Sequence, residues 1–179
     1  SRYWYDLRKR PGFEALENRL VVDWGRGTRS WCRWLADLPA VQWLPEGFHS
    51  EFPGYMDFVL TYSELRQIIQ HPEANQSWRD RLSAVGGIYL LTDSSGQQYV
   101  GSATGPQGLW ARWSNYVETG HGGNKRLKEH DESDPNWRFG LRFTVLRTLS
   151  HSISRKEAIE FEKLFKEKLG CRATGLNAN

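Results

Sequence analysis

Polar and apolar residues alternate most clearly between residues 86 and 102. Two stretches with the two-residue period of β-strands, 87–92 and 97–102, flank the polar connector DSSG at 93–96. Such a connector is typical of a three-residue hairpin loop, in which a type I turn is followed by glycine in the left-handed region. The pattern therefore predicts a β-hairpin.

The length of this loop predicts a register in which Tyr89 lies opposite Gly101 on the neighbouring strand. Tyr99 precedes Gly101 by two residues. Because side chains alternate along strands, Tyr89 and Tyr99 then share one face of the hairpin, with their backbones about 7–8 Å apart. Ile88 and Val100 take the opposite face.

The helical period is clearest near the end of the chain. Ser154 opens a capping-box sequence, SRKE, and Gly170 is a natural helix stop, so we expect one helix between them. Glu162 falls inside the apolar arc of this helix, where a carboxylate must be paired, protonated or bound to a cation. The predicted apolar stripe consists of Ala158, Phe161, Phe165 and Leu169.

Shorter periodic stretches and turn signals predict the other elements. After residue 83 we expect helices over 109–117 and 125–130 and a third strand within 137–149. Before it we expect helices over 13–20, 63–70 and 75–82, strands over 20–24, 41–44 and 55–60, and a turn leading into 29–35.

The predicted fold class is α+β. A three-stranded antiparallel sheet flanked by helices is expected over 84–179, preceded by an accessory α+β domain over 1–83. The composition fits folded domains, since 39% of the 179 residues are apolar and 25% are charged. The net charge is +3, and the whole excess lies in residues 85–179, which is weak support for a polyanionic partner.

Several classes of protein are disfavoured by composition. The chain has no run of about 18 apolar residues, and its first ten residues have no apolar signal core, so we expect no membrane span and no secretion. Cys32 and Cys171 lie far apart without metal-ligand spacing, which favours a reducing, cytoplasmic location. The nine tryptophans are interpreted mainly as packing residues, and the basic and aromatic residues 1–10 as an ordered or nucleic-acid-touching arm.

Five sequence elements together resemble the GIY-YIG nuclease domain in order and approximate spacing, from about residue 86 to 179. They are GIY at 87–89, YVG at 99–101, Arg112, Glu162 and GLN at 175–177. The resemblance implies hydrolysis of a nucleic-acid phosphodiester with one divalent metal ion. DNA is the expected substrate, RNA remains an alternative, and Mn²⁺ is expected to substitute for Mg²⁺.

The resemblance also implies a role for each site residue. Glu162 would be the metal ligand, because Mg²⁺ prefers oxygen ligands and keeps several waters. Tyr89 would act as general base or orient the attacking water, although a phenol with a pKa near ~10 needs assistance. Tyr99 would hold the phosphate or water, Arg112 would clamp the scissile phosphate, and Asn177 would orient the site through its amide.

One position departs from the family pattern. Tyr116 stands four residues after Arg112, where many members carry histidine. Which group assists Tyr89 is therefore open, and His121 and Lys125 are candidates.

Three alternatives stay open beside metal-dependent DNA cleavage. The first is an inactive nucleic-acid-binding module of the same fold, and the second is cleavage directed by branches, flaps or damage rather than by sequence. The third is a protein-interaction scaffold built on the tryptophans. The biological role (restriction, defence, mobility of a genetic element or repair) and the oligomeric state are also open. We expect the accessory domain to help choose the DNA, because a compact nuclease core offers few base contacts.

Overall fold

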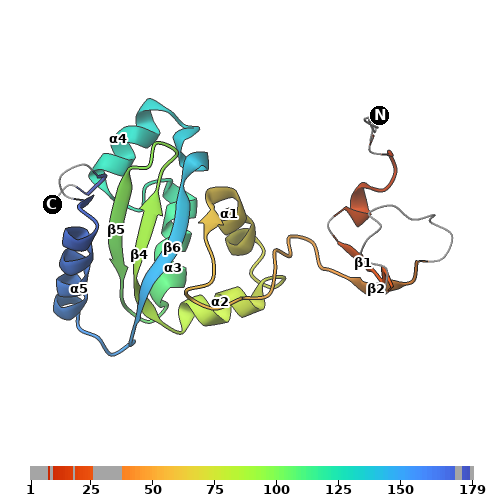
Figure 1. Ribbon diagram of the computed structural model, residues 1–179, viewed down its shortest axis with the longest axis horizontal. Helices are drawn as coiled ribbons and strands as arrows, with labels where there is room; N and C mark the ends of the chain where they lie inside the picture. The colour runs from red at the N-terminus through yellow and green to blue at the C-terminus, as the bar shows by residue number, and fades with distance from the viewer. Residues whose placement is uncertain (1–7, 9, 18, 26–37, 172–174, 178–179) are drawn as a thin grey trace, which may run out of the picture.

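A computed structural model describes residues 8, 10–17, 19–25, 38–171 and 175–177 (Figure 1). The strands are β1 (Leu20–Val22), β2 (Ala40–Trp43), β3 (Leu60–Thr61), β4 (Gly86–Thr92), β5 (Gln98–Ala103) and β6 (Arg142–Leu149). The helices are α1 (Tyr62–Gln70), α2 (Gln76–Ser83), α3 (Gly108–Thr119), α4 (Lys125–Ser133) and α5 (Arg155–Lys168), with the 3-10 segments η1 (Glu14–Leu16) and η3 (Trp137–Gly140). None of these helices is long and apolar enough to cross a membrane.

The main sheet has the strand order β3-β6-β4-β5, and each neighbouring pair is antiparallel. β4 and β5 form the predicted hairpin, in which Tyr89 pairs with Gly101 and Leu91 pairs with Tyr99. The predicted register is confirmed. Within the described part of the chain no strand lies outside β5, so β5 is an edge strand.

The loop of the hairpin accounts for this register. The backbone amide of Asp93 donates to the carbonyl of Gln97 at 3.0 Å, and Gly96 has a φ of 85°. The carboxylate of Asp93 accepts hydrogen bonds from the backbone amides of Ser95 and Gln97, both at 2.9 Å. The left-handed position requires glycine, and the aspartate closes the turn on itself, as the sequence DSSG predicts.

The sheet differs from the predicted three-stranded sheet by one short edge strand. β3 contains only Leu60 and Thr61 and pairs with β6, whereas the pattern predicted a strand over 55–60. The observed strand begins later than predicted, and it ends at Thr61 because this residue is also the N-cap of α1. Its hydroxyl accepts from the amide of Glu64, and the Glu64 carboxylate accepts from the amide of Thr61.

Helices cover both faces of the main sheet (Figure 1). α1, α2 and α3 pack in the core that contains Tyr89 and Trp113. α5 packs on the other face, in a smaller core that contains Ile88, Val100 and Ala158. The two faces differ because side chains alternate along β4 and β5. Tyr89 and Ile88 therefore point into different layers, as predicted.

Residues before the predicted boundary at 83/84 contribute to the larger core. Leu65, Trp78 and Leu82 are at most 1% exposed and pack together with residues of the sheet. Phe58 packs in T-shaped contact with both Trp78 and Trp113. The boundary stays a prediction, and the packing joins α1 and α2 to the main sheet through buried aromatic side chains.

The N-terminal segment contains the predicted strands but not the predicted helix. β1 and β2 pair antiparallel as a separate sheet, here called the ribbon. The described residues of the stretch predicted to be a helix, 13–17, 19 and 20, contain the single 3-10 turn η1 and the first residue of β1. η1 buries no residue and has no side-chain cap. A short helix needs such support. The segment 29–35 and most of the arm at 1–10 lie outside the described residues.

The last helix begins and ends as predicted. Ser154 and Glu157 form the reciprocal capping box, and Gly170 has a φ of 66° after the helix. Leu169 is wrong as a member of the apolar stripe: the helix ends at Lys168, and Leu169 is the C-cap residue and is 40% exposed. The stripe that packs on the sheet is Ala158, Phe161 and Phe165.

Candidate active site

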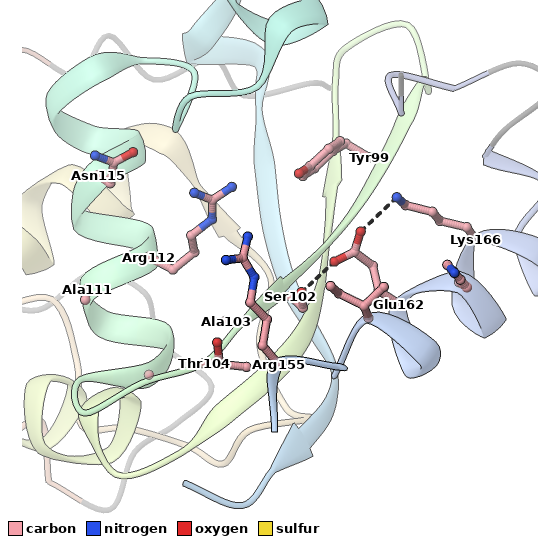
Figure 2. Close-up of a pocket in the computed structure, with 13 residues that line it drawn as sticks. Tyr99, Ser102, Ala103, Thr104, Ala111, Arg112, Asn115, Arg155, Glu162 and Lys166 are labelled. Carbon is pink, nitrogen blue, oxygen red and sulfur yellow. Dashed lines mark hydrogen bonds and ion pairs between the residues drawn. The ribbon is translucent and has the colours of Figure 1, made fainter. Parts of the chain in front are cut away.

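A cleft of about 650 Å³ is lined by the edge strand β5, by α3 and by α5 (Figure 2). Three predicted site residues, Tyr99, Arg112 and Glu162, line it. Tyr99 and Ser102 lie on opposite faces of the sheet, yet both reach this cleft. They can do so because no strand covers the outer side of β5 in the described part of the chain. The edge position of β5 therefore joins both faces of the hairpin in one site.

Both carboxylate oxygens of Glu162 are held by donors (Figure 2). The Lys166 ammonium, one helical turn later, lies 2.8 Å from one oxygen, and the Ser102 hydroxyl donates to the other at 2.5 Å. The side chains of Glu162 and Lys166 are 18% and 6% exposed. Of the three expected states of this carboxylate (paired, protonated or bound to a cation), the structure shows the paired one, and the pairing fixes its orientation at the cleft.

The cleft offers a divalent cation one carboxylate. Glu162 is the one carboxylate among the described residues that line it. No group of three histidine, cysteine, aspartate or glutamate side chains gathers as a metal cluster in the described ranges. A single carboxylate is sufficient for Mg²⁺, which keeps several of its waters. A cation at Glu162 would compete with Lys166 for the same oxygen.

A buried network holds the guanidinium of Arg112. Its Nε donates to the hydroxyl of Tyr89 and its Nη1 donates to the carbonyl of Gly122, both at 2.8 Å. The hydroxyls of Tyr89 and Tyr116 lie 3.1 Å apart, and the Arg112 guanidinium lies 5.0 Å from the centre of the Tyr116 ring. These contacts orient Arg112 from the core side, while its side chain still lines the cleft.

Tyr89 and Tyr116 are buried, neutral phenols. Both are 0% exposed, and burial raises the pKa of each hydroxyl well above its usual value. The neighbouring Tyr99 raises the pKa of Tyr89 further, and the Arg112 guanidinium offsets only part of the rise. The role of general base, which the resemblance implies for Tyr89, stays a prediction. In the structure its hydroxyl orients Arg112.

Gly101 makes room for the ring of Tyr89 directly across the hairpin. A Cβ at residue 101 would lie 2.5 Å from Cζ of Tyr89 and closer still to its hydroxyl oxygen. The ring is surrounded by core residues, including Trp113 and Tyr116 in edge-on contact, so it has no free space to enter. The glycine of the YVG triplet is thus explained by close approach of a side chain.

We expect Gly101→Ala to lower the free energy of unfolding by about 1–3 kcal/mol, since overpacking forces a buried ring to move. Cleavage should fall as well, because a shifted Tyr89 no longer orients Arg112. Denaturant unfolding measures the first effect. In a double-mutant cycle with Tyr89→Leu, the same glycine substitution should destabilise the protein less. Equal destabilisation in both backgrounds would show that the ring is not the obstacle.

Asn177 supports the edge of the hairpin. Its amide oxygen accepts from the backbone amide of Val100 at 2.9 Å, and its amide nitrogen donates to the carbonyl of Val100 at 2.8 Å. The amide of Leu176 also donates to the carbonyl of Gln98 at 2.8 Å. Asn177 is 3% exposed. It thus satisfies backbone groups on the outer side of β5, where no strand of the described chain pairs, next to Tyr99.

His121 and Lys125 do not line the cleft. Nδ1 of His121 accepts from the backbone amide of Gly123 at 3.0 Å, and Lys125 is exposed at the start of α4. The neighbouring residue Gly122 reaches the site instead, through its carbonyl contact with Arg112. Assistance by His121 or Lys125 stays a prediction.

The sequence analysis missed several cleft residues. The role of Ser102 depends on the edge position of β5, which short-range patterns do not reveal. Three other cleft residues could have been predicted from the helical period, because they share one helical face with Glu162: Arg155, Lys163 and Lys166.

The fold and the cleft define a class of protein: a small α+β domain in which an arginine and a single carboxylate converge at an edge strand, suited to a phosphate and a divalent cation. The GIY-YIG catalytic domain, as a family profile, matches residues 85–174, about half of the chain. The chain belongs to the GIY-YIG family. No curated protein and no solved structure matches it. The family is of nuclease type: it acts on nucleic acids and generally uses divalent metal ions.

Proposed function

We propose that this protein is an endonuclease that hydrolyses DNA phosphodiester bonds with Mg²⁺, for which Mn²⁺ substitutes. The observation that carries the proposal is the convergence of Arg112, Tyr99 and Glu162 on one cleft from three different elements. These groups supply what phosphodiester hydrolysis requires, which is neutralised phosphoryl charge and an anchor for a cation.

Each cleft residue has a distinct task in this proposal. Glu162 anchors the cation, which when bound lowers the pKa of a coordinated water and neutralises developing charge. Arg112 contacts the scissile phosphate with the edge of its guanidinium that the core network leaves at the cleft. Tyr99, which is 8% exposed and lines the cleft, donates a hydrogen bond to the phosphate or the attacking water.

The buried residues act through these three. Tyr89 and Tyr116 keep Arg112 in place, and they do so as protonated hydroxyls because burial raises the pKa of both. Asn177 keeps β5 at the position where Tyr99 and Ser102 reach the same cleft. We therefore place Tyr89, Tyr116 and Asn177 as positioning residues.

The direct test is cleavage of a mixed panel of supercoiled, linear and branched DNA, with single-stranded RNA beside it. We expect the intact protein to nick or cut DNA with Mg²⁺ or Mn²⁺ and to leave it unchanged with EDTA. Preference for branched DNA would indicate structure-specific cleavage. Cutting of RNA alone would refute the proposed substrate, and no cutting of any member with either ion would refute the proposed activity.

The ion pair between Glu162 and Lys166 favours a second candidate function. With the carboxylate already neutralised at 2.8 Å by an ammonium, the cleft can bind a nucleic acid without recruiting a metal. A protein of this kind binds the same panel with a salt-dependent affinity but cuts none of it. Binding and cleavage measured on one panel separate the two candidates.

The accessory domain, residues 1–83, is proposed to help select the DNA. Its ribbon is suited to this role, since the major groove admits a two-stranded β-ribbon and every residue of β2 is exposed. Val41 is 65% exposed on this strand.

We expect Val41→Glu to weaken DNA binding several-fold and to change the pattern of cleavage sites, because the new carboxylate would face the phosphates. The matched control is Val59→Glu, at a valine that is 59% exposed outside the ribbon. Gel analysis of cleavage products is the measurement. Identical patterns for both variants and the unmodified protein would remove the ribbon from DNA selection.

A further inference from the structure

α5 turns a charged face toward the cleft. Five residues of α5 line the cleft, and their spacing places them on one side of the helix. They are Arg155, Ile159, Glu162, Lys163 and Lys166. An adjacent face of α5, with Ala158, Phe161 and Phe165, packs on the sheet. α5 therefore carries two functions along its length: one face stabilises the fold, and the other forms a wall of the site.

The cations on this face exceed the acids. Of the three cations that α5 places in the cleft, Lys166 is paired with Glu162. The side chains of Arg155 and Lys163 make no hydrogen bond or ion pair with any described residue. Arg112 adds a further positive charge from the facing wall. Figure 2 shows the guanidinium of Arg155 extending into the cleft, toward the side on which Arg112 lies.

Two guanidiniums that enter one cleft repel each other unless an anion lies between them. Arg155 is also the first residue of α5 after its N-cap Ser154, a position at which the helix dipole favours an acidic side chain over a basic one. A cation at that position is locally unfavourable, but it strengthens the attraction of the helix N-terminus for an anion. The arrangement is explained if the cleft is built to receive phosphates.

The geometry points to a phosphate track on α5, in which Arg155 and Lys163 each contact a phosphate of the bound strand that flanks the scissile one. Eight residues separate them, which corresponds to about 12 Å along the helix. Since successive nucleotides of one strand rise by about 3.4 Å, the two side chains reach different phosphates. Glu162 lines the same cleft and directly precedes Lys163, so this arrangement places the scissile phosphate nearer to Lys163 than to Arg155. This inference rests on the proposed function, because it places the substrate in the same cleft.

The test is DNA binding without cleavage, measured in EDTA on a labelled duplex over a series of salt concentrations. Arg155→Ala and Lys163→Ala should each weaken binding about tenfold at moderate salt. Each should also reduce the magnitude of the slope of log K against log salt by about 0.9, since one phosphate contact is lost. The matched control is Lys156→Ala, which removes the same charge from an exposed position of α5 that does not line the cleft.

Cleavage kinetics provide a second readout. With the metal present, both cleft variants should raise KM with little change in kcat, because they act on neighbouring phosphates rather than on the reacting one. Arg155→Lys should recover part of the binding, since it retains the charge without the planar guanidinium.

Two failures can be told apart. If the intact protein neither binds nor cuts DNA, the proposed function fails and the phosphate track with it. If the intact protein binds and cuts, but Arg155→Ala and Lys163→Ala give the affinity and salt slope of Lys156→Ala, the phosphate track alone is refuted. Arg155 and Lys163 are then solvated surface charges.

Discussion

Replacing Glu162 with glutamine is expected to lower the rate of DNA cleavage about a thousandfold, which corresponds to about 4 kcal/mol of transition-state stabilisation. Glutamine has nearly the same shape as glutamate, and its amide oxygen can still accept a hydrogen bond from the Ser102 hydroxyl. In the unmodified protein this hydroxyl donates to the Glu162 carboxylate at 2.5 Å. It removes the negative charge that anchors a divalent cation. The loss should therefore reflect the metal site rather than a change in packing.

The same substitution removes the counter-ion of Lys166. This ammonium is nearly buried, so we expect Glu162→Gln to lower the free energy of unfolding by about 3 kcal/mol. The double variant Glu162→Gln, Lys166→Met removes both charges and should recover most of the stability. It should not recover cleavage, because the anchor for the cation is still missing.

Metal binding can be measured without substrate. Mn²⁺ titrated into the protein and followed by electron paramagnetic resonance should bind at least about tenfold more weakly to Glu162→Gln than to the unmodified protein. The matched control is Glu160→Gln, at an exposed carboxylate on the same helix outside the cleft. Full cleavage by Glu162→Gln, or equal Mn²⁺ affinity in all three proteins, would exclude Glu162 as the metal ligand.

Arg112→Lys is expected to reduce cleavage about a hundredfold, or about 3 kcal/mol. Lysine keeps the charge but cannot donate simultaneously to the Tyr89 hydroxyl, to the Gly122 carbonyl and to a phosphate, as the planar guanidinium can. The expected loss is in kcat, since Arg112 acts on the phosphate at which charge develops.

A control variant separates this effect from a general loss of stability. Arg138 donates to the carboxylate of Asp131 through two nitrogens, outside the cleft. Arg138→Lys also breaks a paired guanidinium, so it should lower the melting temperature without lowering kcat. If Arg112→Lys and Arg138→Lys reduce kcat equally, or if Arg112→Lys retains full turnover, Arg112 has no direct part in the reaction.

The hairpin was predictable because its determinants are local. The loop DSSG sets the turn, the turn sets the register, and alternation then places Tyr89 and Tyr99 on the same face, as observed. The start of α5 was equally accessible, because the Ser154 capping box involves residues only three positions apart. The helical period also indicated that Glu162 needs a partner, a proton or a cation, because an unpaired buried charge has a high free energy. The structure shows that the partners are Lys166 and Ser102.

The predictions that were wrong or incomplete depend on contacts between residues that are far apart along the chain. β3 joins the sheet by pairing with β6, which lies more than 80 residues later in the chain. No local sequence pattern predicts which strand of a sheet will pair with a further strand. The prediction of a helix over 13–20 was wrong for a related reason. The sequence pattern is amphipathic, but the observed segment buries no residue against a core. Leu169 has the spacing of the apolar stripe, but the helix ends before this residue, so its side chain does not pack on the sheet.

The sequence by itself determined the family, the hairpin register and the identity of the residues that the family motif names, because motifs, turns and periods are properties of neighbouring residues. Only the tertiary structure decided that β5 is an edge strand, that Ser102 and Tyr99 open into the same cleft, and that Tyr89 is buried beneath Arg112. These relations depend on which elements pack beside one another. That choice is made by burial and pairing across the whole chain, so no short stretch contains it.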